Sequence, residues 1–508
     1  MRIARRAVAF FREDRLFAAL FGALLLLYTL PLAIPRVLPL QDYAAHPRIV
    51  SVWRALDAPD AKLMRSGYER RSALVPYASF YFTMRALGSV MSLEAAQRVI
   101  LVVYGWALPL GLLYLLLAFG RDRRYALLAF PLIYNTPFIY GLLPQVLSYP
   151  MVLFALGLYK RSLDAPSVAR DVGLAVLASV LYLTHLVGFT AFGLAAAVMW
   201  AGHVRSLRDG LRHGLFALPS LGLLFIWSTS RIASGELEVR FAPPAEKLAQ
   251  LSPILNDVLL GMVDELALLG LAATLLCALV IGSRERPPRA DWTLAGGAMA
   301  VLVGYFALPA DVLKPNLNLG TSGRLLCVAV LLLCGLPRAR LRGRAALVLA
   351  PALLTSVVLG ATLTSTFTTF GEQAGRIDEV LAKLPAQRRV LPLIYDAHDG
   401  VHRGEPLMHI VKLYQVRKGG YLPQAPVTDV APFRLRGGVA TPQPVWRLPK
   451  TFHYLLHGAF YHYFFVIYGA GEKVLDAPVG ATPAQAKLVA KAGRFALYKN
   501  IGPLRPVD

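Results

Sequence analysis

The chain has 508 residues, of which 56% are hydrophobic and only 16% are charged, and its mean hydropathy is +0.52. These proportions exclude a water-soluble globular protein, because the charged residues are too few to cover its surface, and they predict a protein embedded in a lipid bilayer. The formal net charge is +23, but the basic residues lie in short runs between apolar segments. Such runs are typical of topology signals and argue against a nucleic-acid partner.

The chain begins with the basic sequence MRIARRAVAFFREDR, which leads into an apolar run at 16–35. This run is longer than the core of a typical signal peptide and lacks a small-residue cleavage site, so we expect a retained membrane anchor. The three cysteines all lie within apolar stretches. They therefore say nothing about the redox state of the compartment.

Basic runs alternate with the apolar stretches so that the basic runs all fall on one side of the membrane. The positive-inside rule identifies that side as the cytoplasm. The prediction is a polytopic α-helical protein of the inner membrane with about 11 spans, a cytoplasmic N-terminus and an extracytoplasmic segment after 367. Several stretches are shorter than the roughly 20 residues that a bilayer requires, which indicates tilted or broken helices. The expected spans are 16–35, 96–119, 125–141, 147–159, 172–185, 187–202, 214–230, 258–282, 292–309, 323–337 and 344–366.

The segment between the first two spans, about 36–92, is long and charged. Apolar residues recur in it at helical spacing, among them Ile49, Val50 and Trp53, and predict an amphipathic helix on the outer membrane surface at about 47–57. A second apolar run at 72–91 contains Arg85 and several polar residues. It favours another interfacial helix, with a twelfth span as the alternative.

Asp42 lies just before the first of these helices, with Tyr43 beside it and His46 four residues further on. A carboxylate at the edge of the bilayer has its proton affinity raised by partial desolvation, which suits a general base. Two other interpretations stay open. Asp42 caps the helix that follows, or Asp42 and His46 hold a metal ion, which requires a third ligand that the sequence does not name.

A Gly-Thr-Ser-Gly turn at 320–323, which includes Ser322 and Gly323, leads into an apolar stretch that begins with Arg324. Free backbone N–H groups at a helix start attract phosphate, as does a guanidinium, and Lys314 adds a further positive charge. This pattern predicts a site for a lipid phosphate. The alternative is an ordinary loop from which Arg324 reaches to the membrane interface.

Two further ionisable residues lie at the outer ends of expected spans. His185 stands between two short apolar runs, and Arg231 stands where another span ends. An ionisable group at membrane depth is a functional candidate, although a hydrogen-bonded turn histidine is the commoner outcome. His185 and Arg231 are therefore secondary functional candidates.

The composition changes at about 367, and residues 367–508 predict a small extracytoplasmic α/β domain. Helices are expected in GRIDEVLAKLP and TPAQAKLVAKAG, and strands in RRVLPLIYDAHDG, YHYFFVIYGAG and RFALYKN. Asp396, His398, Asp399 and His402 are close in sequence, but their spacing matches no compact metal signature. We therefore expect solvated loop residues there and no metal.

The acidic residue in QDYAAH, the amphipathic outer helices, the many spans and the C-terminal domain together resemble the GT-C superfamily of membrane glycosyltransferases. The resemblance implies an inverting transfer of a sugar from a polyprenyl-phosphate donor to a glycan, lipid or protein acceptor, with Asp42 as the base. It also implies that Arg324 and Lys314 stabilise the phosphate, with Arg231 or His185 as a further contributor. His46 or Tyr43 would orient Asp42 or the acceptor, and His185 would help bind a substrate. No cofactor is implied firmly, and a divalent cation stays open.

Two classes of protein remain as alternatives to this enzyme. A lipid or glycan transporter, such as a flippase, would predict charged residues deep within several spans and an internal repeat, and the sequence shows neither clearly. A non-catalytic membrane assembly protein would use the C-terminal domain to bind a partner.

Overall fold

The computed structural model describes residues 13–58, 62–70, 76–232, 238–282, 291–314, 320–423, 432–435, 442–445 and 447–504. The chain divides into two compact units. The first contains residues 1–34, 100–138 and 142–365, and the second contains residues 35–99, 139–141 and 366–508. The outer segment near 36–92, which the sequence analysis assigns to the membrane module, is thus grouped with the C-terminal residues.

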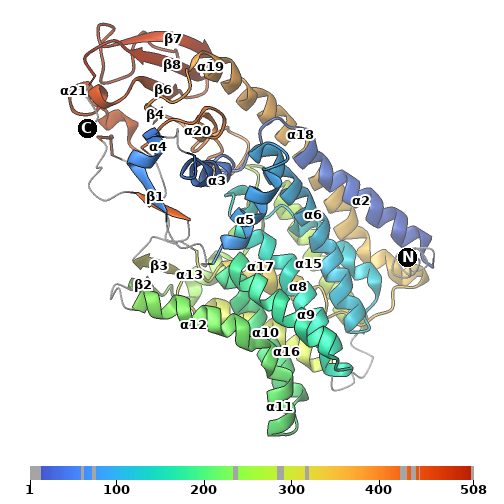
Figure 1. Cartoon of the computed structure of the whole chain (residues 1–508). Helices are drawn as coiled ribbons and strands as arrows, with labels where there is room; N and C mark the ends of the chain where they lie inside the picture. The colour runs from blue at the N-terminus through green and yellow to red at the C-terminus, as the bar shows by residue number, and fades with distance from the viewer. Residues whose placement is uncertain are drawn as a thin grey trace. The chain divides into compact units, whose positions relative to one another are not determined.

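The first unit is a bundle of long helices (Figure 1). Local signals set several helix starts: the Asp14 carboxylate accepts the Phe17 N–H at the start of α2, and the Ser167 hydroxyl accepts the Arg170 N–H at the start of α9. The main helices are α2 (Arg15–Ala33), α6 (Leu93–Ala118), α8 (Leu143–Asp164), α9 (Val168–Thr184), α10 (Leu186–His203), α12 (Leu218–Ile232), α15 (Val263–Gly282), α16 (Asp291–Ala307), α17 (Arg324–Leu333) and α18 (Ala350–Gly375).

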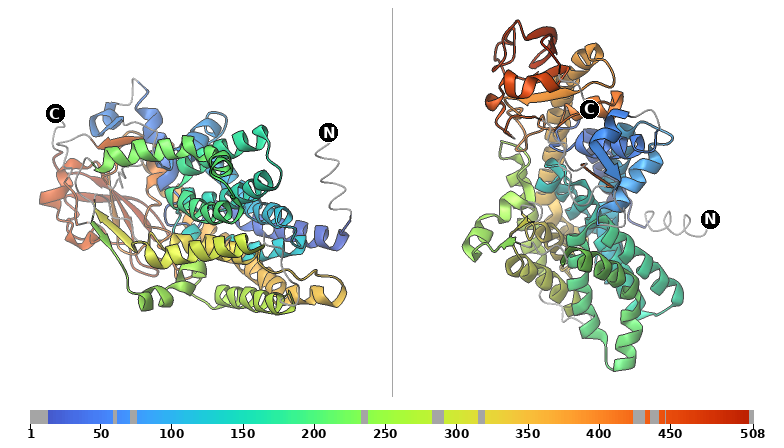
Figure 2. Two further views of the ribbon diagram at one scale, coloured as in Figure 1. Left: turned by 90° about the horizontal axis from the view of Figure 1, so that it is seen from below. Right: turned by 60° about the vertical axis from the view of Figure 1, so that its left-hand side comes forward.

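Shorter elements connect these helices. Helix α10 packs on both α8 and α16, and α16 packs on α17. Figure 2 shows green and yellow-green helices of this unit lying side by side. The connecting elements are η1 (Arg123–Leu132), α7 (Thr136–Ile139), α11 (Leu207–Gly214), η2 (Leu215–Ala217), β2 (Glu238–Arg240), α13 (Pro244–Ala249), α14 (Leu251–Asn256), β3 (Asp311–Lys314) and η3 (Gly343–Leu349).

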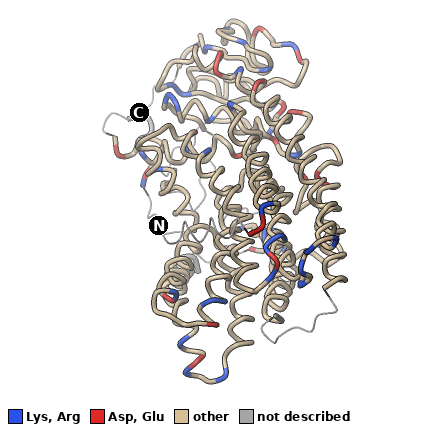
Figure 3. The backbone as a smooth tube through the Cα atoms, turned by 90° about the vertical axis from the view of Figure 1, so that its right-hand side faces the viewer, with Lys and Arg blue, Asp and Glu red and all other residues tan. Residues whose placement is uncertain are grey.

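Six helical stretches in the described residues are long and apolar enough to cross a bilayer. Figure 3 shows long helical stretches without charge, and charged residues gathered at turns such as the one between α10 and α11. The chain is therefore a multi-pass membrane protein, whereas the predicted number of about 11 spans is not confirmed. The six stretches are Arg15–Ala33, Leu93–Ala118, Leu186–His203, Leu207–Thr229, Val263–Gly282 and Gly343–Lys383.

The expected span at 125–141 is not one continuous helix. It consists of the 3-10 helix η1 and the single turn α7, with Pro131 inside η1 and Pro137 inside α7. Each proline removes one backbone N–H donor from this segment, although α2, α6 and α8 stay continuous around Pro31, Pro109 and Pro150. The side chains of 125–132 are all buried. The predicted cytoplasmic and extracytoplasmic ends of the later helices depend on counting 125–141 as one span, and they stay a prediction.

The second unit contains a four-stranded sheet in the order β4-β6-β8-β7. β4 (Val390–Ile394) and β6 (Tyr463–Ile467) are parallel, whereas β8 (Phe495–Asn500) is antiparallel to both β6 and β7 (Ala486–Ala492). Helix α19 (Ile377–Lys383) packs on β7 and β8. This arrangement confirms the predicted sheet domain. The remaining elements are α3 (Ala45–Ala55), α4 (Lys62–Gly67), β1 (Tyr68–Arg70), α5 (Ala78–Leu87), α20 (Lys412–Lys418), β5 (Phe433–Leu435), η4 (Pro449–Thr451), α21 (Tyr454–His457) and η5 (Gly458–Phe460).

One predicted helix of this domain is wrong. TPAQAKLVAKAG forms a turn and strand β7, along which Lys487, Val489 and Lys491 are exposed in alternation with more buried residues. The period of two is that of an edge strand with one face on the domain core. Gly493, at a φ of 57°, allows the tight turn that pairs β7 with β8.

Candidate active site

Asp42 lies in a turn before α3, and its side chain does not cap that helix. The residue at the N-cap position is Ala44, and no side chain accepts a hydrogen bond from the first turn. Asp42 takes part only through its backbone carbonyl, which accepts the Ala45 N–H at 3.0 Å. The capping interpretation of the Asp42 carboxylate is therefore wrong, and the carboxylate is available for another contact.

That contact is His409, whose Nε2 lies 3.2 Å from Asp42 Oδ1. The His409 side chain is 8% exposed, whereas Asp42 keeps 28% of its side-chain surface accessible. Burial, together with the charge of nearby Lys412, lowers the pKa of His409 well below its ordinary value, so the imidazole is neutral at pH 7. The neutral His409 ring therefore lies against the Asp42 carboxylate, and its buried Nδ1 has no hydrogen-bond partner within the described residues.

Lys412 supplies a positive charge at the same place. It is the first residue of α20, its side chain is 3% exposed, and its Nζ has no hydrogen-bond partner within the described residues. Burial and the Arg48 charge lower the pKa of Lys412 to about 7, although Asp42 opposes the shift. Burial likewise raises the pKa of Asp42 to about 6, although Lys412 opposes it. An ionised carboxylate and an ammonium therefore coexist near neutral pH.

Helices α3 and α20 pack on each other. This packing holds Asp42, in the turn before α3, close to Lys412 at the start of α20. The Arg48 guanidinium, buried in α3, donates its Nε–H to Gln415 Oε1 and its Nη2–H to the Tyr68 hydroxyl at 2.7 Å. The Ser51 hydroxyl donates to the Gln415 carbonyl at 3.2 Å. The expected amphipathic helix thus exists, but its polar face packs against protein instead of facing water at the membrane surface. Arg48 is therefore satisfied by its own partners, whereas Lys412 Nζ has no hydrogen-bond partner within the described residues.

His46 anchors the turn from the other side and does not touch Asp42. Its Nε2 donates to the Gly141 carbonyl at 2.7 Å, so its Nδ1 accepts from the Tyr81 hydroxyl at 3.2 Å. Burial lowers the pKa of His46 to about 4, so the ring stays neutral. Gly141 has a φ of 75°, and a Cβ there would lie 2.8 Å from the Asp42 Cβ. Only glycine fits beside Asp42 at this point.

Tyr43 is buried at 2% exposure, and its carbonyl accepts a hydrogen bond from Gln97 Nε2 at 2.9 Å. It therefore helps to fix the turn that carries Asp42. The sequence predicted Asp42, Tyr43 and His46 as site residues but did not predict His409 or Lys412. The one signal for them was a histidine and a lysine three residues apart in the apolar run MHIVKLY.

The first unit contains the predicted phosphate-binding residues. His185 separates α9 from α10 and is 1% exposed, and Arg324 at the start of α17 lies near enough for its charge to act on the imidazole. Ser322 is buried, and Gly323 occupies the N-cap position of α17. The structure thus brings His185 and Arg324, 139 residues apart by their numbers, into one neighbourhood.

The other two predicted cations are placed differently. Lys314 ends β3, is 60% exposed, and forms an ion pair with Glu238 at 3.0 Å, which offsets its charge. Arg231 lies in α12, and its side chain is outside the described residues.

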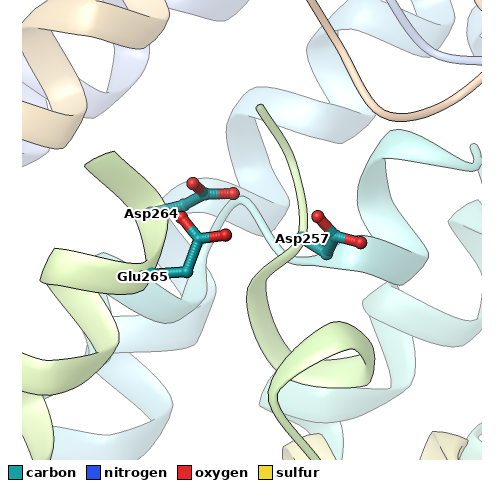
Figure 4. Close-up of side chains that lie close together, drawn as sticks. All are labelled: Asp257, Asp264 and Glu265. Atoms are coloured by element: carbon teal, nitrogen blue, oxygen red, sulfur yellow. The ribbon is translucent and has the colours of Figure 1, made fainter. Parts of the chain in front are cut away.

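The described residues contain one group of side chains close enough to share a metal ion, Asp257, Asp264 and Glu265 (Figure 4). Asp264 already has a structural role, because its Oδ2 accepts the Val258 and Leu259 N–H groups at 2.6 and 3.0 Å. Those bonds hold the loop between α14 and α15. Asp42 does not belong to such a group among the described residues, so no step below is assigned to a metal.

The loop at 396–402 is more ordered than the sequence analysis expects. Asp399 Oδ2 pairs with His402 Nδ1 at 2.5 Å, and His402 is 1% exposed, with its ring against Phe367 and Phe370. The expectation of solvated residues is therefore wrong for His402, which is a packed, hydrogen-bonded histidine. The same loop appears in no candidate metal group of the described residues.

Searches of known proteins give structural matches only. No protein-family model and no curated protein matches the sequence. Among solved structures, ArnT from Cupriavidus metallidurans bound to undecaprenyl phosphate is 13% identical, with a TM-score of 0.54 over 98% of this chain and 100% of that one. The apo form of ArnT is 13% identical, with a TM-score of 0.53 over 95% and 98% of the two chains.

The arabinofuranosyltransferase AftD from Mycobacteria is 17% identical, with a TM-score of 0.49 over 96% of this chain. The chain spans only 42% of the length of AftD. The ArnT match over nearly both full lengths shows that this chain shares the fold of ArnT, which confirms the predicted polytopic helical fold with a C-terminal sheet domain.

Proposed function

We propose that this chain is a membrane glycosyltransferase that moves a sugar from a polyprenyl-phosphate donor to an acceptor on the extracytoplasmic side of the inner membrane. The observation that carries the proposal is the buried Lys412 ammonium, which has no hydrogen-bond partner in the described residues, beside the accessible Asp42 carboxylate. A buried cation without a partner is costly unless a ligand anion completes its site. The fold of ArnT, solved with undecaprenyl phosphate, supports a lipid phosphate as that anion.

The chemistry requires one base and one cation. Asp42 takes the proton of an acceptor hydroxyl as the oxygen attacks the anomeric carbon, with inversion. The bond from that carbon to the phosphate oxygen breaks, and the lipid phosphate leaves with the electron pair and one additional negative charge. Lys412 stabilises that charge in a site from which water is largely excluded. His409 acts as a positioning residue for Asp42, while His46, Tyr43 and Gly141 fix the turn.

The direct test uses proteoliposomes that contain the purified chain and a synthetic polyprenyl-phosphate sugar. Incubation with a cell-envelope extract should release polyprenyl phosphate and move the labelled sugar to the extract. A flippase would instead carry the intact labelled lipid across the bilayer. Translocation without release of polyprenyl phosphate would reject the proposal.

The pH dependence of transfer should be bell-shaped with a narrow optimum near neutrality. Asp42 must be ionised, so activity should rise as pH passes through about 6. Lys412 must be protonated, so activity should fall as pH passes through about 7. Because Asp42 and Lys412 interact, the apparent pKa values of the two limbs describe the pair together and not either residue alone. The measurement is kcat against pH, and a rate that stays flat from pH 5 to 9 would contradict these roles.

Arg324 gives a separate prediction within the first unit. Arg324→Ala should weaken binding of undecaprenyl phosphate by about tenfold or more, because hydrogen bonds to a charged group contribute roughly 1.5–3 kcal/mol. Native mass spectrometry of the detergent-solubilised protein measures this. Arg208→Ala, which removes an exposed arginine of α11, is the matched control. Equal lipid binding by both variants would reject the phosphate role of Arg324.

A further inference from the structure

A cavity of about 150 Å³ lies at the carboxyl end of β4 and is formed entirely by the second unit. Its volume is below the roughly 300–1,000 Å³ of pockets that hold drug-sized ligands, so it fits a group of about one ring. The wall combines polar and apolar side chains. They include Tyr395, Asp396, His398, Glu405, Met408 and Arg447.

The two carboxylates that line this cavity are each paired with a guanidinium. Arg447 Nη2 donates to Glu405 Oε2 at 2.6 Å, and Arg494 Nη2 donates to Asp396 Oδ2 at 2.8 Å. Burial alone would raise the pKa of Asp396, but the His398 N–H and the Arg494 charge lower it below its ordinary value, so the carboxylate stays ionised. With each carboxylate matched by a guanidinium, the cavity favours a neutral ligand. Lys412, in contrast, is a buried cation without a hydrogen-bond partner in the described residues, so its surroundings favour an anionic ligand.

The cavity also offers unused hydrogen-bonding capacity. Glu405 Oε1 lies 3.9 Å from His398 Nε2, which is too long for a hydrogen bond, so a ligand hydroxyl can contact both atoms. Arg447 has a φ of 63°, a left-handed conformation that a residue other than glycine rarely adopts. Such strain persists where the surrounding structure enforces it, which is common in binding sites.

The cavity and the Asp42 site share two chain segments. Met408 lines the cavity, and its neighbour His409 contacts Asp42. The Glu405 N–H donates to Gln41 Oε1 at 3.3 Å, and Gln41 directly precedes Asp42. A ligand bound beside Glu405 and Met408 is therefore held next to the residues that position the base.

We infer that this cavity is an acceptor subsite that binds one neutral, hydroxyl-rich sugar ring of a glycan. The inference rests on the proposed function, since it assigns the acceptor of the same reaction. A sugar ring matches both the polar and the apolar side chains of the wall. Its hydroxyl groups would contact Glu405, His398 and Arg447, and its C–H face would contact the apolar side chains.

Saturation-transfer NMR on the full chain in nanodiscs tests binding without any transfer reaction. The probes are methyl glycosides of neutral pentoses and hexoses, with inorganic phosphate as competitor. We expect wild type and Asp42→Asn to bind at least one glycoside equally, and Glu405→Gln and Arg447→Gly to bind it about tenfold more weakly. Arg447→Gly removes the side chain but tolerates the left-handed backbone. In the transfer assay, Arg447→Gly should raise the acceptor KM by a similar factor with little change in kcat.

The matched control is Arg376→Ala, which removes a similarly exposed arginine from a surface pair with Glu379. Wild-type binding by Arg447→Gly, no binding of any glycoside by wild type, or displacement of the glycoside by phosphate would each overturn the inference. Different results would reject the proposed glycosyltransferase function and the proposed acceptor subsite. Loss of transfer in Asp42→Asn with an unchanged acceptor KM in Arg447→Gly would reject only the subsite, and glycoside binding by a chain that transfers no sugar would reject only the enzyme.

Discussion

Replacing Asp42 with asparagine should lower the transfer rate by about 10²–10⁴-fold, the usual contribution of a positioned general base. Asparagine has nearly the same shape and can keep the contact with the His409 ring, so the turn before α3 should keep its structure. What is lost is the ability to take a proton from the acceptor hydroxyl. The measurement is kcat for release of polyprenyl phosphate in proteoliposomes, with donor binding recorded in parallel and expected to change little.

Asp57→Asn is the matched control for this variant. Asp57 belongs to the same outer segment, its side chain is 32% exposed against 28% for Asp42, and its Oδ2 pairs with Arg85 at 2.8 Å. A surface ion pair contributes little to stability, so Asp57→Asn should transfer sugar at the wild-type rate. Transfer by Asp42→Asn at a rate within a few-fold of the control would remove Asp42 from the mechanism.

The sequence was enough to single out Asp42 but not to identify what surrounds it. An acidic residue between a membrane anchor and an amphipathic helix is a local pattern, and it can be recognised within about a dozen residues. His409 and Lys412 lie more than 360 positions further along the chain, and only the packing of α20 on α3 brings them to Asp42. Without homologous sequences, no local pattern connects residues at that separation.

The helix at 45–55 shows a second limit of prediction from the sequence. Periodicity predicted the helix correctly, with Arg48, Ser51 and Arg54 opposite the apolar face. The same periodicity does not say whether a polar face meets water or another polar surface. Here Gln415 and Tyr68 satisfy Arg48, so the polar face is an interface within the second unit.

The two misassigned elements have different causes. In TPAQAKLVAKAG, good helix formers such as alanine and lysine dominate, yet pairing with β8 determines the conformation, because tertiary context overrides a weak propensity. At 125–141, hydropathy alone predicted a span. Pro131 and Pro137 each remove a backbone donor from this segment, but α6 and α8 stay helical around Pro109 and Pro150, so proline alone does not explain the break.

Replacing Lys412 with methionine should lower kcat by about 10²–10³-fold, the usual effect of removing one group that stabilises charge in the transition state. Methionine fills a similar volume but carries no charge. The same substitution should raise the melting temperature, because a buried ammonium without a partner costs stability that an apolar side chain recovers. A loss of activity together with a gain in stability is expected of a residue kept for function, and a merely structural lysine would lose both.

The pH profile separates the role of Lys412 from a general disturbance of the site. Because the Lys412 charge lowers the pKa of Asp42, the residual activity of Lys412→Met should show its acid limb at higher pH than wild type and should lose the alkaline limb. Lys418→Met, on the same helix, removes an ammonium that donates to the Leu381 and Leu384 carbonyls at 2.7 and 2.8 Å. It should lower the melting temperature and leave both limbs in place. If the pH profile of Lys412→Met also kept both the acid and the alkaline limb, Lys412 would not be the group that stabilises the leaving phosphate.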